Sequence, residues 1–253
     1  MLNVRVVKLG GNELHRPAWM AECARGLKAA EPVVVVHGGG QAVDAWSRRL
    51  NLPVEKRDGL RVTTPEIAEV VEMVLGGPVN RLVVSALRAA GVDAVGLSGV
   101  DGGLLTARPA AGLGHVGEIV HVRASLLESL LLAGLTPVVA PVAPAEDAGV
   151  PLNVNADHAA AAVAGALHAE ELLFVSDVPG VDIDGVAQPT LAASEIGAMI
   201  ELGIATDGMA AKLRSAVQAL GAGVRAVRIG DLEMFESATA GTRLLAAPAT
   251  QPA

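Results

Sequence analysis

Two glycine runs close two of the aliphatic stretches near the N-terminus. Lys8 precedes Gly10 and Gly11 at the end of a valine-rich run, and three glycines at 38–40 follow the valines at 33–36. Because glycine has no side chain, main-chain N–H groups can approach an oxyanion closely there, and the N-terminus of a following helix adds a positive dipole. Lys8 adds a full positive charge. These residue types at this spacing indicate a site that binds a phosphoryl group for transfer.

Other polar residues stand where predicted strands and helices end. Arg61 closes a hairpin, Asn153 and Asp157 lie at the entry to a helix, and Lys212 lies on a later helix. Ligands of open α/β sheets bind outside the carboxyl ends of the strands, so these side chains can converge. Taken one at a time, Arg61 is typical of a surface ion pair, Asp157 of the first turn of a helix, and Lys212 of an exposed helical position.

Strands and helices alternate along the chain, which predicts an α/β fold: a three-layer α-β-α sandwich with a central, mainly parallel sheet. Thr64 and Pro65 are suited to begin a helix, and Asp58 with Gly59 to form a hairpin turn. The loop at 143–151 divides the chain into an N-terminal lobe, residues 1–145, and a C-terminal lobe, residues 146–253. Helices are predicted over residues 17–29, 41–50, 64–75, 79–90, 124–133, 156–167, 192–202 and 208–220, and the principal strands over 4–9, 33–36, 94–97, 137–140, 171–176 and 226–229.

The composition excludes several classes of protein. Of the 253 residues 51% are hydrophobic, yet only two Phe, two Trp and no Tyr occur, so the core must be aliphatic, as in a buried parallel sheet. The net charge of −8 argues against nucleic acid or an acidic membrane as a partner. The single cysteine, Cys23, allows no internal disulfide and no cysteine metal cluster. The apolar stretch 126–145 is broken by prolines and predicts no membrane span, so we expect a cytoplasmic protein.

Several familiar catalytic motifs do not occur in the sequence. It contains no G-x-x-x-x-G-K-[ST] loop, no G-x-G-x-x-G after a strand, no H-E-x-x-H and no G-x-S-x-G. His37 precedes the second glycine run, and we expect it to hold that turn by a local hydrogen bond.

Nine short motifs follow one another along the chain. They are KLGG at 8–11, VHGGG at 36–40, GLRVT at 59–63, EMVLGGPVNR at 72–81, AVGLSG at 94–99, GHVGE at 114–118, NVNAD at 153–157, VSDVPGV at 175–181 and TDGMAAK at 206–212. Any one of these is a weak signal, whereas nine in one order and spacing form a strong one. With them the chain resembles the N-acetylglutamate kinases of the amino-acid kinase family over nearly its whole length.

The resemblance implies that ATP phosphorylates the side-chain carboxylate of N-acetyl-L-glutamate, a step of arginine biosynthesis that gives an acyl phosphate. A carboxylate is already a nucleophile at neutral pH, so catalysis would rest on alignment and charge neutralisation without a general base. By resemblance, Lys8 and Lys212 would flank the transferring phosphoryl group. Asp157 would hold both lysines by charge-assisted hydrogen bonds.

The resemblance also implies the binding residues. Arg61 would clamp the α-carboxylate of the substrate bidentately, and Asn153 with the backbone of Gly39 and Gly40 would hold the rest. The N–H groups of Gly10, Gly11 and Gly39 would face phosphoryl oxygens, and Mg²⁺ would ride on the phosphates with few protein ligands. ATP would lie over the C-terminal half, against Ser176, Asp177, Val178, Gly180, Val181, Ile204, Thr206, Gly208 and Met209.

Two features depart from the family pattern. Members that arginine inhibits carry an additional N-terminal helix that links dimers into a hexamer, and this sequence begins almost at the first strand. We therefore expect a homodimer without inhibition by arginine, with its contact around residues 68–82. Asn12 and Glu13 follow the first glycine run, where small or apolar residues are usual. Glu13 thus places a negative charge near the phosphate site unless it faces solvent.

Two other functions stay open. One is a kinase of a related acyl acceptor, such as aminoadipate on an acidic carrier protein, which would need a basic docking face that a chain of net charge −8 does not suggest. The other is a non-catalytic ligand sensor that keeps the fold but not the chemistry. The presence of Lys8, Asp157 and Lys212 together favours an enzyme over a sensor.

Overall fold

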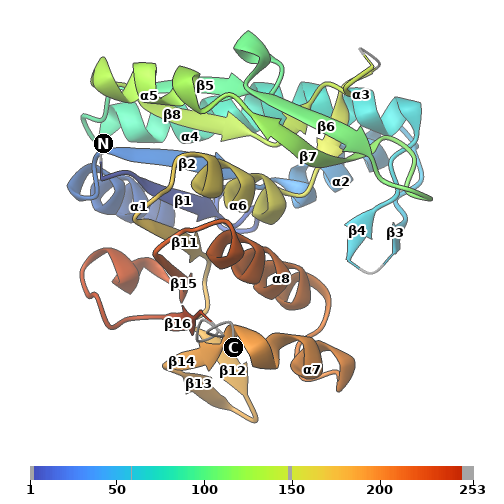
Figure 1. Ribbon diagram of the computed structural model, residues 1–253. Helices are drawn as coiled ribbons and strands as arrows, with labels where there is room; N and C mark the ends of the chain where they lie inside the picture. Colours follow the sequence, from blue (N-terminus) through green and yellow to red (C-terminus); the bar gives the residue numbers. More distant parts are fainter. Residues whose placement is uncertain (1–2, 58, 148–149, 247–253) are drawn as a thin grey trace, which may run out of the picture.

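The computed structural model of the chain describes residues 3–57, 59–147 and 150–246. Its centre is an eight-stranded sheet in the order β14-β16-β15-β11-β1-β2-β8-β5, which runs from the orange β14 to the green β5 in Figure 1. All neighbouring strands of this sheet are parallel except β15 and β16. The strands are β1 (Arg5–Leu9), β2 (Val33–His37), β5 (Ala94–Ser98), β8 (Thr136–Ala140), β11 (Glu171–Val175), β14 (Thr190–Ala192), β15 (Ala226–Gly230) and β16 (Thr242–Leu245).

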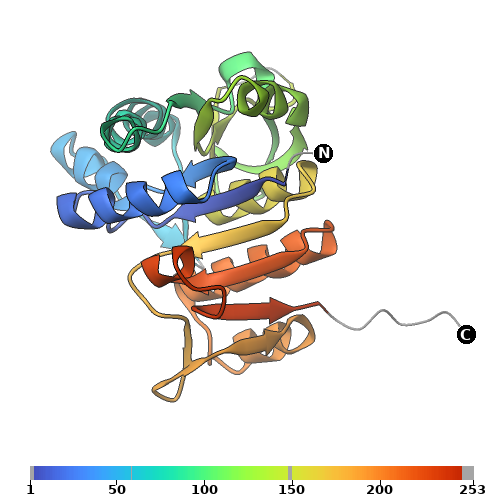
Figure 2. The same ribbon diagram turned by 90° about the vertical axis from the view of Figure 1, so that its left-hand side faces the viewer.

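Helices cover both faces of the sheet (Figures 1 and 2). Helices α5, α6 and α8 share one hydrophobic cluster with the strands, and α1 to α4 share the other. The helices are α1 (Pro17–Ala29), α2 (Gly40–Arg49), α3 (Pro65–Val74), α4 (Asn80–Ala89), α5 (Ala124–Leu132), α6 (Ala156–Ala166), α7 (Ile196–Glu201) and α8 (Asp207–Gly221).

The core has two halves because strand side chains alternate between the faces. Val6 and Val34 pack in the half that contains α6 and α8. Their chain neighbours Val7 and Val35 pack in the half that contains α1 and α4. A strand buried on both faces is a continuous aliphatic run in the sequence, which is what the N-terminal strands show. The predicted three-layer α-β-α sandwich with a mainly parallel sheet is confirmed.

The carboxyl ends of the central strands meet at one edge of the sheet. Leu9 of β1 lies opposite Val175 of β11 on one side and opposite His37 of β2 on the other. Each of these three residues is followed directly by a segment that the sequence analysis singled out, namely the two glycine runs and Ser176. The register therefore brings these segments together at the edge where open α/β sheets bind ligands.

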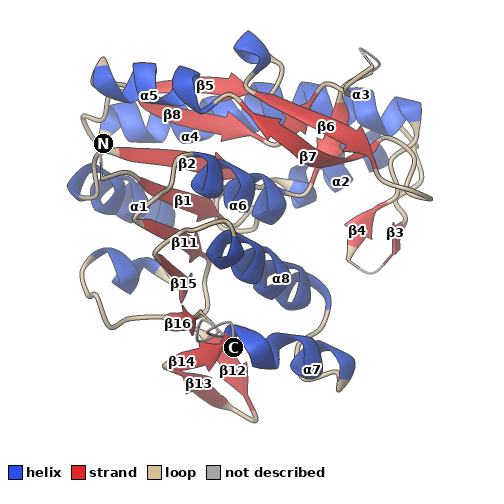
Figure 3. Ribbon diagram, in the orientation of Figure 1, coloured by secondary structure: helices blue, strands red, loops and turns tan. Residues whose placement is uncertain are grey.

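Three smaller strand groups surround this edge. A four-stranded sheet in the order β6-β7-β10-β9 contributes β10, which carries Asn153, and the two-stranded hairpin β3–β4 projects from the body at the right of Figure 3. Asp58, predicted in the turn of this hairpin, lies outside the described residues. The strands are β3 (Lys56–Arg57), β4 (Leu60–Arg61), β6 (Leu105–Pro109), β7 (Val116–Val122), β9 (Val142–Ala143), β10 (Leu152–Val154), β12 (Val181–Ile183) and β13 (Val186–Gln188).

Most predicted helices are present with similar bounds. The helix predicted over 17–29 coincides with α1, and the Thr64 side chain caps α3 by accepting a hydrogen bond from the N–H of Ile67. The helix predicted over 192–202 is shorter, because Ala193–Glu195 forms a 3₁₀ turn before α7 begins. Between α3 and α4 the chain makes a π-helical turn, Leu75–Val79, which the sequence analysis did not predict.

One stretch, Pro65–Ala89, is long and apolar enough to span a membrane by length and composition. It consists of α3, the π-helical turn and α4, and its side chains Ile67, Val74 and Val83 are buried in the core. A core helix passes the same test, so this stretch is weak evidence for a membrane span. The stretch 126–145, for which no span was predicted, contains most of α5 and all of β8 and β9.

The predicted division into two lobes falls between paired strands. The loop at 143–151 connects β9 to β10, and these strands pair antiparallel, with Leu152 opposite Ala143. The eight-stranded sheet takes four strands, β1, β2, β5 and β8, from residues 1–145 and four, β11, β14, β15 and β16, from residues 146–253. The division into a substrate lobe and a nucleotide lobe stays a prediction.

Candidate active site

Three buried charged side chains form the centre of the candidate site. The Nζ atom of Lys8 lies 2.8 Å from Oδ1 of Asp157, and the Nζ atom of Lys212 lies 3.5 Å from the same oxygen. Lys8 comes from β1, Asp157 from the first turn of α6, and Lys212 from α8. All three are more than nine-tenths buried. The fold therefore brings together the three residues that the sequence analysis named as catalytic.

Burial and neighbouring charges set the ionisation of this cluster. Burial by itself raises the pKa of Asp157, but Lys8 and Lys212 bring it below its usual value. Burial lowers the pKa of Lys212 to about 8, with Lys8 adding to the effect and Asp157 opposing it. The ring of Phe174 lies 5.3 Å from Nζ of Lys212, a cation–π contact. Two ammonium groups thus face one carboxylate, and the excess charge is positive.

The two glycine runs touch each other beside Lys8. A Cβ on Gly11 would lie 2.5 Å from the backbone nitrogen of Gly39, so this close approach requires glycine. The N–H of Gly10 donates to the carbonyl of Val175 at 2.9 Å, because the ladder between β1 and β11 continues one residue past the strand. In this conformation the Gly10 N–H is therefore occupied, and its role toward a phosphoryl group stays a prediction. Among the described residues, the N–H groups of Gly11 and Gly39 have no acceptor.

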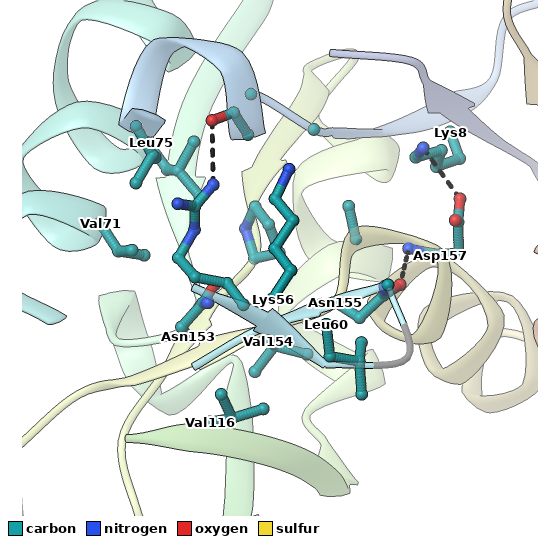
Figure 4. Close-up of a pocket in the computed structure, with 18 residues that line it drawn as sticks. Lys8, Lys56, Leu60, Val71, Leu75, Val116, Asn153, Val154, Asn155 and Asp157 are labelled. Carbon is teal, nitrogen blue, oxygen red and sulfur yellow. Dashed lines mark hydrogen bonds and ion pairs between the residues drawn. The ribbon is translucent and has the colours of Figure 1, made fainter. Parts of the chain in front are cut away.

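A pocket of about 200 Å³ opens next to this cluster. Figure 4 shows Lys8 and Asp157 on one side of it and Val71 and Leu75 on the other. The walls combine backbone of the second glycine run, charged and amide groups, and aliphatic side chains. Six of the sequence-predicted residues line the pocket, namely Lys8, Gly39, Gly40, Arg61, Asn153 and Asp157.

Arg61 is held in this pocket by two partners from α2. Its Nη1 makes an ion pair with Oδ1 of Asp44, and its Nη2 donates to the carbonyl of Gly40 at 3.0 Å. Lys56, on the other strand of the hairpin, lies 3.4 Å from Oδ2 of the same Asp44. Arg61 and Asp44 are both buried, while Lys56 is half exposed and also lines the pocket. Asp44 therefore ties both strands of the β3–β4 hairpin to α2.

Asn153 belongs to a network that joins three of the sequence motifs. Its side-chain nitrogen donates to Oγ1 of Thr63 at 3.1 Å, and Thr63 Oγ1 donates to the carbonyl of Arg61 at 3.1 Å. The N–H of His115 donates to the carbonyl of Thr63, and the N–H of Asn153 donates to the carbonyl of His115. A Cβ on Gly114 would collide with the Thr63 carbonyl, so glycine is required at this crossing. The network fixes Asn153 relative to the strand that carries Arg61.

The residues predicted to bind ATP lie on two segments of the C-terminal half. The Ser176 hydroxyl is buried and has no hydrogen-bond partner within the described part of the chain, and Val178 and Ile204 expose apolar side chains. The tip of the β3–β4 hairpin approaches this side, since a Cβ on Gly59 would lie 3.4 Å from Asp207 of α8. None of the predicted ATP residues lines the pocket described above, so their convergence on a nucleotide stays a prediction: Ser176, Asp177, Val178, Gly180, Val181, Ile204, Thr206, Gly208 and Met209.

Glu13 does not face solvent. The residue is 3% exposed, and a Cβ on Gly10 would lie 2.5 Å from its Oε2. Burial raises the pKa of Glu13, and the nearby Asp177 adds to this, while its own backbone N–H, Lys8 and Arg16 oppose it. The carboxyl group of Glu13 therefore lies against Gly10 of the first glycine run.

Sequence reasoning missed several residues that build the site. Asp44 holds Arg61 by an ion pair, and Lys56 lies beside the same carboxylate. The side chains of Leu60 and Val116 form apolar parts of the pocket wall. The hairpin predicted around Asp58 and Gly59 was a usable signal for Lys56, because Lys56 lies directly opposite Arg61 on the neighbouring strand. No local signal marks Asp44, which occupies an ordinary polar position of an amphipathic helix until the hairpin folds over it.

The chain is similar to known proteins over nearly its full length. Residues 3–231 match the model of the family described as "Amino acid kinase family". An acetylglutamate kinase of Chloroflexus aurantiacus is 44% identical over 237 residues, which cover 92% of this chain and 93% of the relative. An acetylglutamate kinase of Geobacillus kaustophilus is 45% identical over 219 residues, which cover 85% of this chain and 84% of the relative.

A solved structure shares the fold. The crystal structure of smu.665 from Streptococcus mutans UA159 superposes with a TM-score of 0.86 at 28% sequence identity, covering 96% of this chain and 99% of that one. The similarity in sequence and in structure extends across both glycine runs, the charged cluster and the pocket. The chain therefore belongs to the amino acid kinase family, and it is a kinase.

Proposed function

We propose that this enzyme uses ATP to phosphorylate the side-chain carboxylate of N-acetyl-L-glutamate, giving N-acetyl-L-glutamyl 5-phosphate for arginine biosynthesis. Relatives named acetylglutamate kinase, more than 40% identical over most of the chain, support this choice of substrate. The observation that carries the proposal is the buried cluster of Lys8, Asp157 and Lys212 beside a pocket that contains Arg61 and Asn153.

The reaction makes one bond and breaks one. A carboxylate oxygen of the substrate attacks the γ-phosphorus of ATP, and the bond from that phosphorus to the bridging oxygen of ADP breaks. The carboxylate is ionised at neutral pH, so no proton has to be removed. The enzyme's task is to align the two anions and to offset the charge that spreads over the phosphoryl oxygens.

The charged cluster is suited to that second task. Lys8 and Lys212 contact the same carboxylate oxygen from different elements, so their ammonium groups converge on one space. Asp157 keeps both lysines oriented and leaves an excess of positive charge. The N–H groups of Gly11 and Gly39 add preorganised dipoles at the same place, which act as an oxyanion hole built from backbone.

The pocket is suited to an acylated amino diacid. Arg61 presents a planar fork for the α-carboxylate, already oriented by Asp44 and Gly40. Asn153 and the backbone of Gly39 and Gly40 provide hydrogen-bonding groups for the rest of the polar frame, and aliphatic side chains such as Leu75 and Val116 accommodate the acetyl methyl group.

ATP and Mg²⁺ complete the proposal. The base and ribose would lie over the loops that follow β11 and precede α8, where the predicted nucleotide residues are found. Among the described residues no group of three or more His, Cys, Asp or Glu side chains could hold a metal ion. A magnesium ion carried by the nucleotide phosphates would supply further charge neutralisation there.

We infer a cytoplasmic homodimer. The contact we expect, around residues 68–82, uses the outer side of α3 and the π-helical turn. Most apolar side chains of that segment are buried within the chain, and Met73, 47% exposed, is the large apolar side chain it presents outward among the described residues. Light scattering of the full chain tests the oligomeric state, and a monomer at assay concentrations would contradict the homodimer.

Hydroxylamine trapping tests the substrate assignment. The protein is incubated with Mg-ATP, hydroxylamine and one of three acceptors: N-acetyl-L-glutamate, L-glutamate or N-acetyl-L-aspartate. We expect ATP-dependent hydroxamate with N-acetyl-L-glutamate alone. Folded protein that binds ATP but yields no hydroxamate would contradict the proposal, and would favour a carrier-bound acceptor such as aminoadipate or a ligand sensor.

A further inference from the structure

Two of the nine motifs contribute residues that meet in the core, away from the pocket wall and from the charged cluster. Asn80 and Arg81 close the motif at 72–81, and Gly96 stands in the middle of the motif at 94–99. None of the three belongs to the pocket wall. They nevertheless meet one another, and they reach the second glycine run through His37.

The side-chain amide of Asn80 is fully buried, and both its nitrogen and its oxygen have hydrogen-bond partners. Its nitrogen donates to the carbonyl of Val138 at 2.9 Å and faces Nε2 of His37 at 3.1 Å. Its oxygen accepts a hydrogen bond from Nη2 of Arg81 at 2.7 Å. The Val138 carbonyl can only accept and the Arg81 guanidinium can only donate, so these two partners determine which end of the amide faces His37.

The orientation of Asn80 determines where His37 carries its proton. Because the amide presents N–H to Nε2, that nitrogen must be the acceptor. The proton then lies on Nδ1, which donates to the carbonyl of Gly38 at 2.8 Å. The ring is 0% exposed, and burial lowers the pKa of His37 to about 4, with the positive charge of Lys8 acting in the same direction. The neutral Nδ1–H tautomer is thus assigned from the hydrogen-bond network.

This hydrogen bond holds the peptide between Gly38 and Gly39. In a trans peptide the C=O and the following N–H point in opposite directions. With the Gly38 carbonyl turned toward His37, the Gly39 N–H turns away from it. That nitrogen lies against Gly11, at the meeting point of the two glycine runs.

The surrounding backbone makes room for these contacts. A Cβ on Gly96 would overlap both Oδ1 of Asn80 and Nη2 of Arg81, so only glycine leaves space for the pair. The π-helical turn before Asn80 contains Pro78 and a non-helical Gly77, and it carries Asn80 into the core beneath β2 and β8. Single π-helical turns of this kind are found frequently at functional sites.

We propose that Asn80 is a positioning residue for phosphoryl transfer: it holds His37 as the Nδ1–H tautomer, and His37 aims the Gly39 N–H at the transferring group. The last step rests on the proposed function, whereas the state of His37 is a property of the free protein. The series Arg81, Asn80, His37 and Gly38 is called the positioning relay below.

Nitrogen-15 NMR of the imidazole tests the relay in the free protein. The spectrum of the full chain, with the His37 signals identified from a His37→Gln variant, should show a protonated Nδ1 and an unprotonated Nε2 near neutral pH. In Asn80→Leu, Nε2 loses its hydrogen-bond donor, so the nitrogen-15 chemical shifts of Nδ1 and Nε2 should move toward each other. A wild-type ring protonated on Nε2 would overturn the inference.

Steady-state kinetics test its consequence. In Asn80→Leu and in Gly96→Ala, which displaces the amide from the other side, we expect kcat to fall on the order of 10- to 100-fold, while KM for ATP changes little. Val83→Ala removes a fully buried contact from the same helix and is the control for instability. It should lower Tm and keep the wild-type kcat.

The outcomes separate the relay from the proposed function. The relay would be overturned if Asn80→Leu and Gly96→Ala kept the wild-type kcat. It would also be overturned if Val83→Ala, compared at matched Tm, lost as much kcat as these two variants. Wild-type protein that forms no hydroxamate would overturn the proposed function, and the NMR measurement would still decide the tautomer of His37.

Discussion

Replacing Asp157 by Asn should move the pH dependence of the enzyme toward acid. The carboxylate oxygen that lies 3.5 Å from Lys212 Nζ attracts that ammonium group by up to about 5 kcal/mol at an effective dielectric of about 20. Since one pKa unit corresponds to about 1.4 kcal/mol, this is an upper bound of about 3 units. With solvent relaxation we take about 2 units, which lowers the Lys212 pKa from about 8 to about 6.

The consequence is a loss of the charged lysine at neutral pH. With a pKa of about 6, only about a tenth of Lys212 is protonated near pH 7, compared with about nine-tenths in the unmodified site. Activity should therefore fall about 10-fold from this cause alone, and further from the lost orientation of Lys8. Lys8 and Lys212 stay buried without the Asp157 carboxylate, so the free energy of unfolding of the variant should also fall, by about 3–5 kcal/mol at most.

The assay is kcat/KM for ATP measured across pH, which reports ionisations of the free enzyme. In the wild type, activity should decline as pH rises through about 8, because Lys212 must be charged to act. In Asp157→Asn the decline should begin near pH 6, and in Lys212→Arg it should move above the wild-type value. Asp93→Asn makes the same chemical change at the exposed ion pair with Arg88 and should alter nothing. A basic limb that stays near 8 in Asp157→Asn would refute the reasoning.

Three further predictions follow from the site. Asp44→Asn frees the Arg61 guanidinium, so KM for N-acetyl-L-glutamate should rise by about 10-fold with kcat nearly unchanged, and an unchanged KM in steady-state kinetics would contradict this. Gly39→Ala places a methyl group 2.6 Å from Leu75 at φ +154°, so kcat should fall on the order of 10-fold or more, whereas Gly76→Ala, with open space around it, should behave as wild type in the same assay. Glu13→Gln should raise Tm near pH 7. Burial raises the folded pKa of Glu13 above the unfolded value of 4.5, so the folded state loses stability as pH rises above 4.5, and the difference in Tm between variant and wild type should vanish below that pH. An equal difference in Tm between Glu13→Gln and wild type at all pH values would contradict this prediction.

The layers of the fold could be predicted because they depend on local patterns. Aliphatic runs at Val33 and Ala226, alternating with helical periodicity, indicate a sheet buried on both faces. The cap at Thr64 and the start of α1 at Pro17 follow from residue type alone. The convergence of Lys8, Asp157 and Lys212 came from family resemblance, since each of them alone fits an ordinary structural role.

The remaining features depend on tertiary contacts that no local pattern encodes. Asp44 is buried only because Arg61, seventeen positions later, folds over α2. The N–H of Gly10 is occupied because the β1–β11 ladder extends one residue past Leu9, a matter of register. Asn80 reaches His37 only through the π-helical turn, whose extra residue per turn has no distinct sequence period.

The most direct test of the central claim follows one oxygen atom. N-acetyl-L-glutamate labelled with oxygen-18 in its side-chain carboxylate is incubated with the enzyme, Mg-ATP and hydroxylamine, and the released phosphate is analysed by mass spectrometry. If a carboxylate oxygen attacks the γ-phosphorus, hydroxylamine then expels phosphate that carries one oxygen-18 atom, and Lys212→Ala should lose this labelled product while N-acetyl-L-glutamate still binds. Unlabelled phosphate from the wild-type enzyme would show that water is the acceptor and would contradict the account.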